Sequence, residues 1–148
     1  MTQKWYDVAM QIDYSNFERY NKDITRVVDK ITLTTSRQMG FPQAFTKKHN
    51  VFDYEGIILY WEPASQAIAV EFTNDVSQSG FIKLVKSDKY GAYAGISTFL
   101  STHSLEPKDY QRRYDYEKID PSLIGAAQDS AVFVFQLVKT NKEEAYEA

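Results

Sequence analysis

Two histidines, His49 and His103, are the only ones in this chain of 148 residues, and they stand in matching positions. Each follows a phenylalanine by four residues, Phe45 in "AFTKKHNV" and Phe99 in "TFLSTHSL", and 54 residues separate the two stretches. Such a pair could ligate a metal ion or transfer protons. The chain has no cysteine, so further metal ligands would have to be carboxylates, and neither H-x-x-x-H nor H-x-x-E-H spacing occurs. We therefore expect no metal and no cofactor, and a hydrogen-bonding or helix-capping role for each histidine.

Other patterns that could support catalysis are weak. Ser101 and His103 are two positions apart, so a helix would point them away from each other. The sequence has no G-x-S-x-G elbow, no G-x-G-x-x-G and no P-loop. The small-residue stretch "GAYAG", residues 91–95, is predicted to let the chain approach a neighbouring element closely rather than to hold a phosphate. We therefore expect that the protein is not an enzyme and has no catalytic residue.

Charge is distributed unevenly along the chain, although the net charge is only −3. Residues 24–50 carry five positive charges and one negative, residues 53–75 carry five negative charges, and residues 81–113 carry six positive and three negative. A basic face acts over a Debye length of about 8–10 Å, so it can bind phosphate even on an acidic protein. Lys47 and Lys48, in the first basic segment, are candidates for phosphate contact. Exposed aromatic residues beside Lys or Arg could stack on bases.

The elements that must position these residues are short strands and two short helices. The runs "GIILYWE" and "AIAVEFT" flank "PASQ" and predict a β-hairpin. Pro42 is suited to the first turn of a helix, and Asn50 can end that helix in the left-handed conformation. The second helix is predicted within "ISTFLSTHSL". The fold class is therefore expected to be α+β, mostly antiparallel β with two short helices.

The order of these signals occurs twice along the chain. Residues 27–51 match residues 81–105 without a gap, mainly by residue type, as in Asn50 with Ser104. We predict a duplicated unit, and the alternative is one mixed sheet with two unrelated helices. The predicted domains are an N-terminal strand and helix arm at 1–25, a first β-α-β-β unit at 26–76, a second at 81–138 and a polar tail at 139–148.

The first unit resembles the AbrB/MraZ-like swapped-hairpin barrels. In "SRQMGFPQAF", the family's arginine, two apolar positions and proline before a short helix are matched by Arg37, Met39, Phe41 and Pro42. The resemblance covers residues 26–72, and it covers 81–138 only in outline because no proline precedes the second helix. It implies a tandem pair of barrel halves, or a homodimer, that binds duplex DNA.

By position, the resemblance implies that Arg26 and Arg37 contact DNA, with Lys30 nearby. The segment is poor in arginine, the residue that reads guanine bidentately, which weakens the expectation of sequence-specific recognition. The first functional hypothesis is a nucleic-acid-binding protein that regulates transcription, with single-stranded binding as a variant. Its predicted contacts are Arg26, Lys30, Arg37, Lys47 and Lys48.

The second functional hypothesis belongs to a different class. It is a non-enzymatic protein-interaction or assembly module that uses the acidic 53–75 hairpin to dock a basic partner. The N-terminal sequence has no apolar signal region, and no apolar run approaches the roughly 20 residues that span a bilayer. We therefore expect a cytoplasmic protein without a membrane partner.

Overall fold

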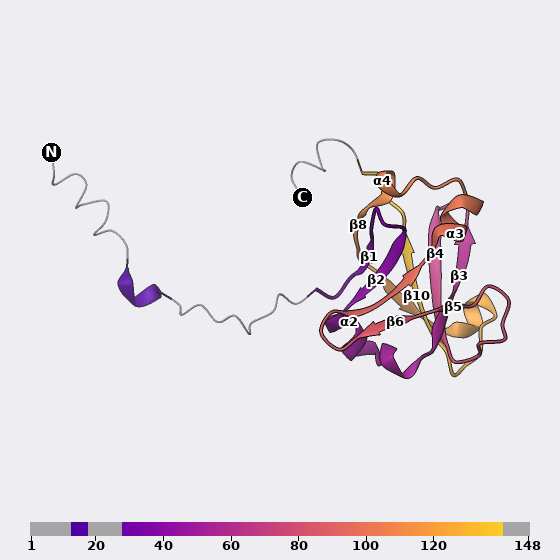
Figure 1. Ribbon diagram of the computed structural model, residues 1–148, viewed down its shortest axis with the longest axis horizontal. Coiled ribbons are helices and arrows are strands. Elements are labelled where there is room, and N and C mark those ends of the chain that lie inside the picture. Colours follow the sequence, from indigo (N-terminus) through magenta and orange to yellow (C-terminus); the bar gives the residue numbers. More distant parts are fainter. Residues whose placement is uncertain (1–12, 18–27, 141–148) are drawn as a thin grey trace.

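The computed structural model describes residues 13–17 and 28–140, which form two five-stranded antiparallel sheets and three short α-helices (Figure 1). Sheet A has the order β6-β7-β2-β1-β8, with bounds β1 Ile31–Leu33, β2 Gln38–Pro42, β6 Val85–Ser87, β7 Gly91–Gly95 and β8 Arg112–Tyr114. Sheet B has the order β5-β3-β4-β10-β9, with bounds β3 Gly56–Glu62, β4 Ala67–Thr73, β5 Ile82–Lys83, β9 Glu117–Ile119 and β10 Ala131–Gln136. The expected α+β class and the predicted hairpin, β3 with β4, are confirmed.

Two of the three described α-helices lie where the sequence predicted them, and the third was not predicted. Helix α2 (Gln43–His49) has Pro42 at its N-cap and ends at Asn50, whose φ of 55° is left-handed as predicted. Helix α3 (Ser97–Thr102) is the second predicted helix. The third, α4 (Pro107–Tyr110), was not expected, because Pro107 begins a new turn rather than only ending the previous one. Three single turns of 3₁₀ helix are η1 (Tyr14–Asn16), η2 (Val51–Asp53) and η3 (Pro121–Ile124).

Neither sheet closes into the barrel that the family resemblance implied. The edge strands β5, β6, β8 and β9 are only two or three residues long, and no strand pairing joins one sheet to the other. A barrel needs a continuous, staggered ladder around its circumference, which strands this short do not provide. The correction is therefore two open sheets that enclose one core.

Side chains from both sheets meet in this core. Phe41 of β2, Phe45 of α2, Phe72 of β4 and Phe133 of β10 are all at most 1% exposed. Phe41 and Phe72 pack edge to face with ring centroids 4.9 Å apart, and Phe45 and Phe133 do so at 5.1 Å. Such pairs add about 0.5–1.5 kcal/mol each to the burial of their area. Four of the nine phenylalanines of the chain therefore serve to join the two sheets.

Two extended segments of the chain change sheets midway. Residues 82–87 pass from β5 in sheet B to β6 in sheet A, and residues 112–119 pass from β8 in sheet A to β9 in sheet B. Leu84 and Tyr114 are each only 3% exposed at these crossings. Both parts of each segment are extended, so period-2 patterning does not reveal the change of sheet.

Positions 54 residues apart have related backbone geometry. Asn50 and Ser104 have φ values of 55° and 54°, and Arg37 and Gly91 have 61° and 106°. The two predicted units do not form separate layers, because 26–76 and 81–138 each supply strands to both sheets. These similarities are what a duplicated unit would produce, and the duplication stays a prediction.

The predicted N-terminal arm at 1–25, apart from residues 13–17, and most of the predicted tail at 139–148 lie outside the described residues. In the part of the chain that the structure describes, no helix has the length and apolar character needed to cross a membrane.

Candidate nucleic-acid interface

The five residues predicted to contact phosphate have different surroundings. Arg26 lies outside the described residues. Arg37 is exposed in the turn between β1 and β2, and Lys47 is exposed on α2. Lys30 Nζ lies 3.2 Å from Asp115 Oδ1, and Lys48 Nζ lies 2.9 Å from Asp29 Oδ2. The paired carboxylates offset part of the positive field that a phosphate would meet at Lys30 and Lys48.

Lys48 belongs to a hydrogen-bonded chain that includes one of the two histidines. The Tyr116 hydroxyl donates to Asp29 Oδ1 at 2.5 Å and accepts from His49 Nε2 at 2.7 Å. Burial opposes ionisation of Asp29, but the hydrogen bonds from Tyr116 and Lys48 outweigh it and lower the pKa of this carboxyl. Burial, reinforced by the hydrogen bond to Asp29, raises the pKa of Tyr116. His49 therefore acts as a hydrogen-bond donor within the fold.

Each histidine ring packs at a steep angle against the phenylalanine ring four residues before it, tilted for His49 and edge to face for His103. The Phe45–His49 and Phe99–His103 ring centroids are each 4.7 Å apart. His103 also packs on the ring of Trp61, at 5.2 Å. Among residues 13–17 and 28–140, no group of three or more His, Asp or Glu side chains is arranged to hold a metal ion.

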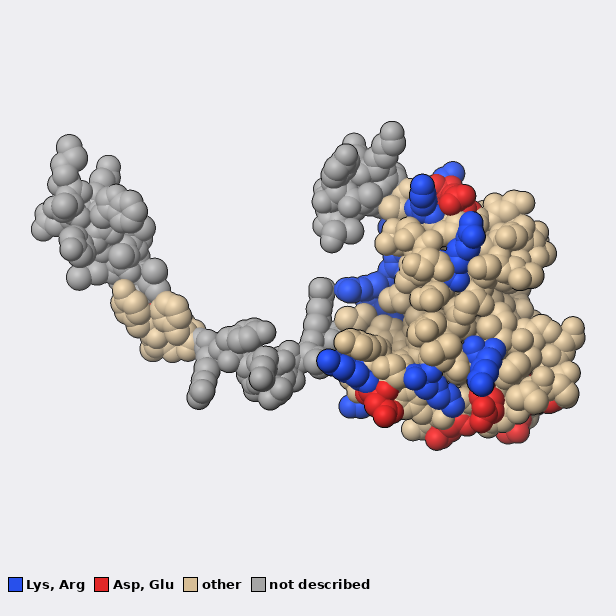
Figure 2. Space-filling model, viewed as in Figure 1, with Lys and Arg blue, Asp and Glu red and all other residues tan. Residues whose placement is uncertain are grey.

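The two sheets carry opposite net charge. The strands of sheet A and their adjoining turns, residues 29–42, 85–95 and 111–115, carry six positive and three negative charges. The corresponding parts of sheet B, residues 55–75, 82–83 and 117–136, carry two positive and seven negative charges. In Figure 2, Lys and Arg are spread over the visible face from its upper to its lower end, and most of the visible Asp and Glu lie along the lower end, with one group at the top. A polyanion would therefore meet the more favourable potential at sheet A.

The outer face of sheet A is the side turned away from the core. Met39, Phe41, Ala92 and Ala94 point inward and are at most 5% exposed, so the alternate residues of β2 and β7 point outward. The strand registers place one outward residue from each strand in a single row across the sheet: Val85, Tyr93, Gly40, Thr32 and Arg113. Val85 is 47% exposed and Tyr93 is 38% exposed, so side chains at this end of the row are open to solvent.

Tyr93 has almost no side-chain neighbours on this face. Its outward neighbours along β7 are Gly91 and Gly95, and its partner on β2 is Gly40. A Cβ at Gly40 would collide with Thr32 Oγ1, and one at Gly91 would collide with the Phe41 carbonyl oxygen. At Gly91, therefore, the chain approaches β2 closely, as predicted for "GAYAG". Gly95 differs, since a Cβ there would meet no atom within 4 Å.

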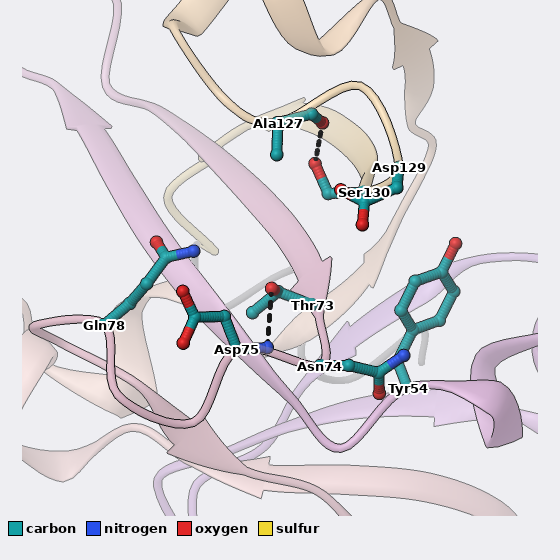
Figure 3. A pocket seen from close by; sticks show the side chains of 8 residues that line it. All are labelled: Tyr54, Thr73, Asn74, Asp75, Gln78, Ala127, Asp129 and Ser130. Atoms are coloured by element: carbon teal, nitrogen blue, oxygen red, sulfur yellow. Dashed lines mark hydrogen bonds between the residues drawn. The ribbon is translucent and has the colours of Figure 1, made fainter.

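Two hollows lie at sheet B. The first, about 220 Å³, is lined by Tyr54, Thr73, Asn74, Asp75, Gln78, Ala127, Asp129 and Ser130 (Figure 3). Two of its hydroxyl groups already have partners: Thr73 Oγ1 accepts from the Asp75 backbone N–H at 3.1 Å, and Ser130 Oγ donates to the Ala127 carbonyl at 2.5 Å. With two aspartates and no basic side chain in its lining, this hollow is poorly suited to phosphate.

The second hollow is open, about 460 Å³, and its lining includes Glu62, Asp115 and Glu117. Glu71, from the same acidic hairpin, is only 1% exposed, and its carboxylate accepts a hydrogen bond of 2.5 Å from the Tyr60 hydroxyl. Burial and this hydrogen bond raise the pKa of Tyr60 to about 12. Glu71 is therefore part of the interior and not of the acidic surface that the hairpin presents.

Tyr93 and Arg113 were not among the predicted contacts. In a strand, residues two apart share a face, so Tyr93 in "GAYAG" has Gly91 and Gly95 as its neighbours on that face. The adjacent arginines Arg112 and Arg113 must point to opposite faces of their strand. These signals are visible in the sequence, but their meeting on one row depends on three strand registers. Comparisons with known protein families, with curated proteins and with solved structures find no match, so function has to be inferred from this geometry.

Proposed function

We propose that the protein binds nucleic acid on the outer face of sheet A and acts as a regulator of transcription. The observation that supports this best is the charge separation between the sheets, together with the uncovered row that exposes Tyr93 and Arg113. A phosphate backbone is attracted to the positive sheet and repelled by the negative one. The regulatory role is suggested by the AbrB/MraZ-like order of Arg37, β2, Pro42 and α2.

Two kinds of basic side chain are proposed to contact the phosphate backbone: arginines without an ion-pair partner, and a lysine whose ion pair can be replaced. Arg113 and Arg37 are exposed, and neither has a hydrogen-bond or ion-pair partner among the described side chains. Lys30 lies on the adjoining row opposite Asp115, with side-chain exposures of 45% and 90%. An exposed ion pair of this kind contributes about 0–1 kcal/mol, so Lys30 can exchange Asp115 for a phosphate at little cost.

Fluorescence polarisation with labelled single-stranded and duplex probes tests the proposal. We expect binding at about 50 mM salt that weakens steeply toward about 200 mM, because neutralised phosphates release counterions. Arg113→Gln should weaken binding about equally for all probe sequences and reduce the salt slope by about one. Lys118→Gln, which removes the same charge from β9 of sheet B, is the matched control and should bind as the natural chain does. Absence of binding to both probes at low salt would exclude this function.

A second candidate function uses sheet B. Its net negative charge and the open hollow bordered by Glu62 and Glu117 fit a basic protein segment. In the same assay, a lysine-rich peptide would replace the nucleic acid, and Glu62→Gln with Glu117→Gln should weaken its binding. Peptide binding without nucleic-acid binding would favour the interaction module over the regulator.

A further inference from the structure

The outer face of sheet A has an aromatic ring without a partner. The Tyr93 side chain makes no hydrogen bond and no ring contact with any other described residue, and three of its four outward neighbours are glycines. The fourth, Val85, is itself 47% exposed. An aromatic side chain in a sheet ordinarily gains its stability from cross-strand neighbours, which Tyr93 lacks on the β2 side. The ring therefore offers a flat apolar surface on a positively charged sheet.

We infer that this face takes single-stranded nucleic acid, with one base stacked on the ring of Tyr93; the inference rests on the proposed function. Stacking requires a base whose face is free. The bases of a duplex are stacked on one another, whereas a single strand can turn a base outward onto an aromatic side chain. Every base has a π-face, so the contact tolerates different sequences. This agrees with the small number of arginines available to read base edges.

Gly95 supplies space for the base. Glycine weakens the interior of a strand, and it is usually retained where the backbone is left-handed or another group comes close. Gly91 meets both conditions, with φ 106° and the Phe41 carbonyl against it. Gly95 meets neither, because its φ is ordinary and a Cβ would enter open space. The space above Gly95 adjoins Tyr93 on the outer face, where a stacked base would extend beyond the ring.

The rest of the row suits the sugar-phosphate backbone. Three strand spacings separate Tyr93 from Arg113, a distance of about 14 Å at 4.8 Å per strand. Thr32 stands between them and has a hydroxyl that can bond to phosphate or sugar. A strand of nucleic acid that crosses the β-strands from Tyr93 to Arg113 would therefore have its base held at one end and a phosphate held at the other.

Fluorescence polarisation with oligothymidylate and oligouridylate of about 15 nucleotides and with a duplex of the same length tests the inference, at fixed low salt. Tyr93→Ala should weaken single-strand binding about 5- to 140-fold, the effect of losing one stacked base. Tyr93→Phe keeps the ring and should bind as the natural chain does.

Gly95→Thr is a second variant, and it separates an effect on binding from an effect on stability. Threonine suits a strand and no atom opposes its Cβ, so the thermal midpoint should stay the same or rise. Single-strand affinity should nevertheless fall, because the added side chain occupies the space beside Tyr93. Tight duplex binding that is unchanged by Tyr93→Ala would overturn the stacking inference and leave the proposed function standing. Absence of binding to every probe would overturn both.

Discussion

At the scale of single residues, the Tyr116 hydroxyl joins parts of the chain that are distant in sequence. It connects Asp29, just before β1, with His49 at the end of α2, and it comes from the segment between β8 and β9. Asp29 in turn holds Lys48. A partly buried chain of this kind fixes the orientation of each member, because an unsatisfied group would cost about 1–3 kcal/mol. Lys48, one of the lysines predicted to meet phosphate, is thus attached to the exposed end of this chain.

The partly buried position of His49 predicts a dependence of stability on pH. Burial lowers the pKa of His49, and the opposing charge of Asp29 does not fully offset this. The unfolded chain, with a histidine pKa of about 6.5, then binds a proton more readily than the folded protein. The stability contributed by neutral His49 is fully present above about pH 6.5 and is lost as the pH falls below that value.

Urea titrations at about pH 7.5 and about pH 5.5 measure this effect, and we expect a smaller free energy of unfolding at the lower pH. His49→Gln keeps a donor for the Tyr116 hydroxyl but does not titrate, so it should reduce the difference between the two conditions. The carboxylate of Asp29 does not interfere, since its lowered pKa places its contribution below about pH 4. An equal difference in the natural chain and the variant would contradict this assignment.

At the scale of elements, strand β7 contains two glycines, of which only one occupies a position that other residues cannot adopt without strain. Gly91→Ala should destabilise the protein by about 1–3 kcal/mol or more, because the residue has a left-handed φ and its Cβ would collide with the Phe41 carbonyl. Gly95→Ala, in the same strand, should be neutral or stabilising by up to about 1 kcal/mol. Chemical denaturation of both variants measures the contrast, and equal losses would show that the register of β7 on β2 is not as described.

The elements also show which parts of the structure could be predicted. The hairpin of β3 and β4 and the capped helix α2 depend on residues close in sequence, such as Pro42 and Asn50, and both are found as expected. The changes of sheet near Leu84 and Tyr114 depend on distant pairing, and local patterning could not reveal them. The same holds for the candidate site: the basic residues were visible, but the ion pair of Lys30 with Asp115 was not.

At the scale of the whole molecule, the shared core predicts that the protein unfolds as one unit. The strand pairs β2 with β7 and β4 with β10 each join a strand of 26–76 to a strand of 81–138. Phe45, which is fully buried, packs on Phe72 and Phe133 of sheet B as well as on Phe41 of sheet A. Neither predicted unit can therefore lose its packing without exposing the core of the other.

Phe45→Ala tests this coupling, together with Phe99→Ala at the position 54 residues later. The first change leaves a cavity at the centre of the core and should lower the free energy of unfolding by about 3–5 kcal/mol. The second should cost less, because Phe99 is only partly buried and packs at the margin on Trp61. In both variants, far-UV and near-UV circular dichroism should report a single coincident transition. Two separated transitions, with only one shifted by Phe45→Ala, would show that the two units fold independently in spite of their shared sheets.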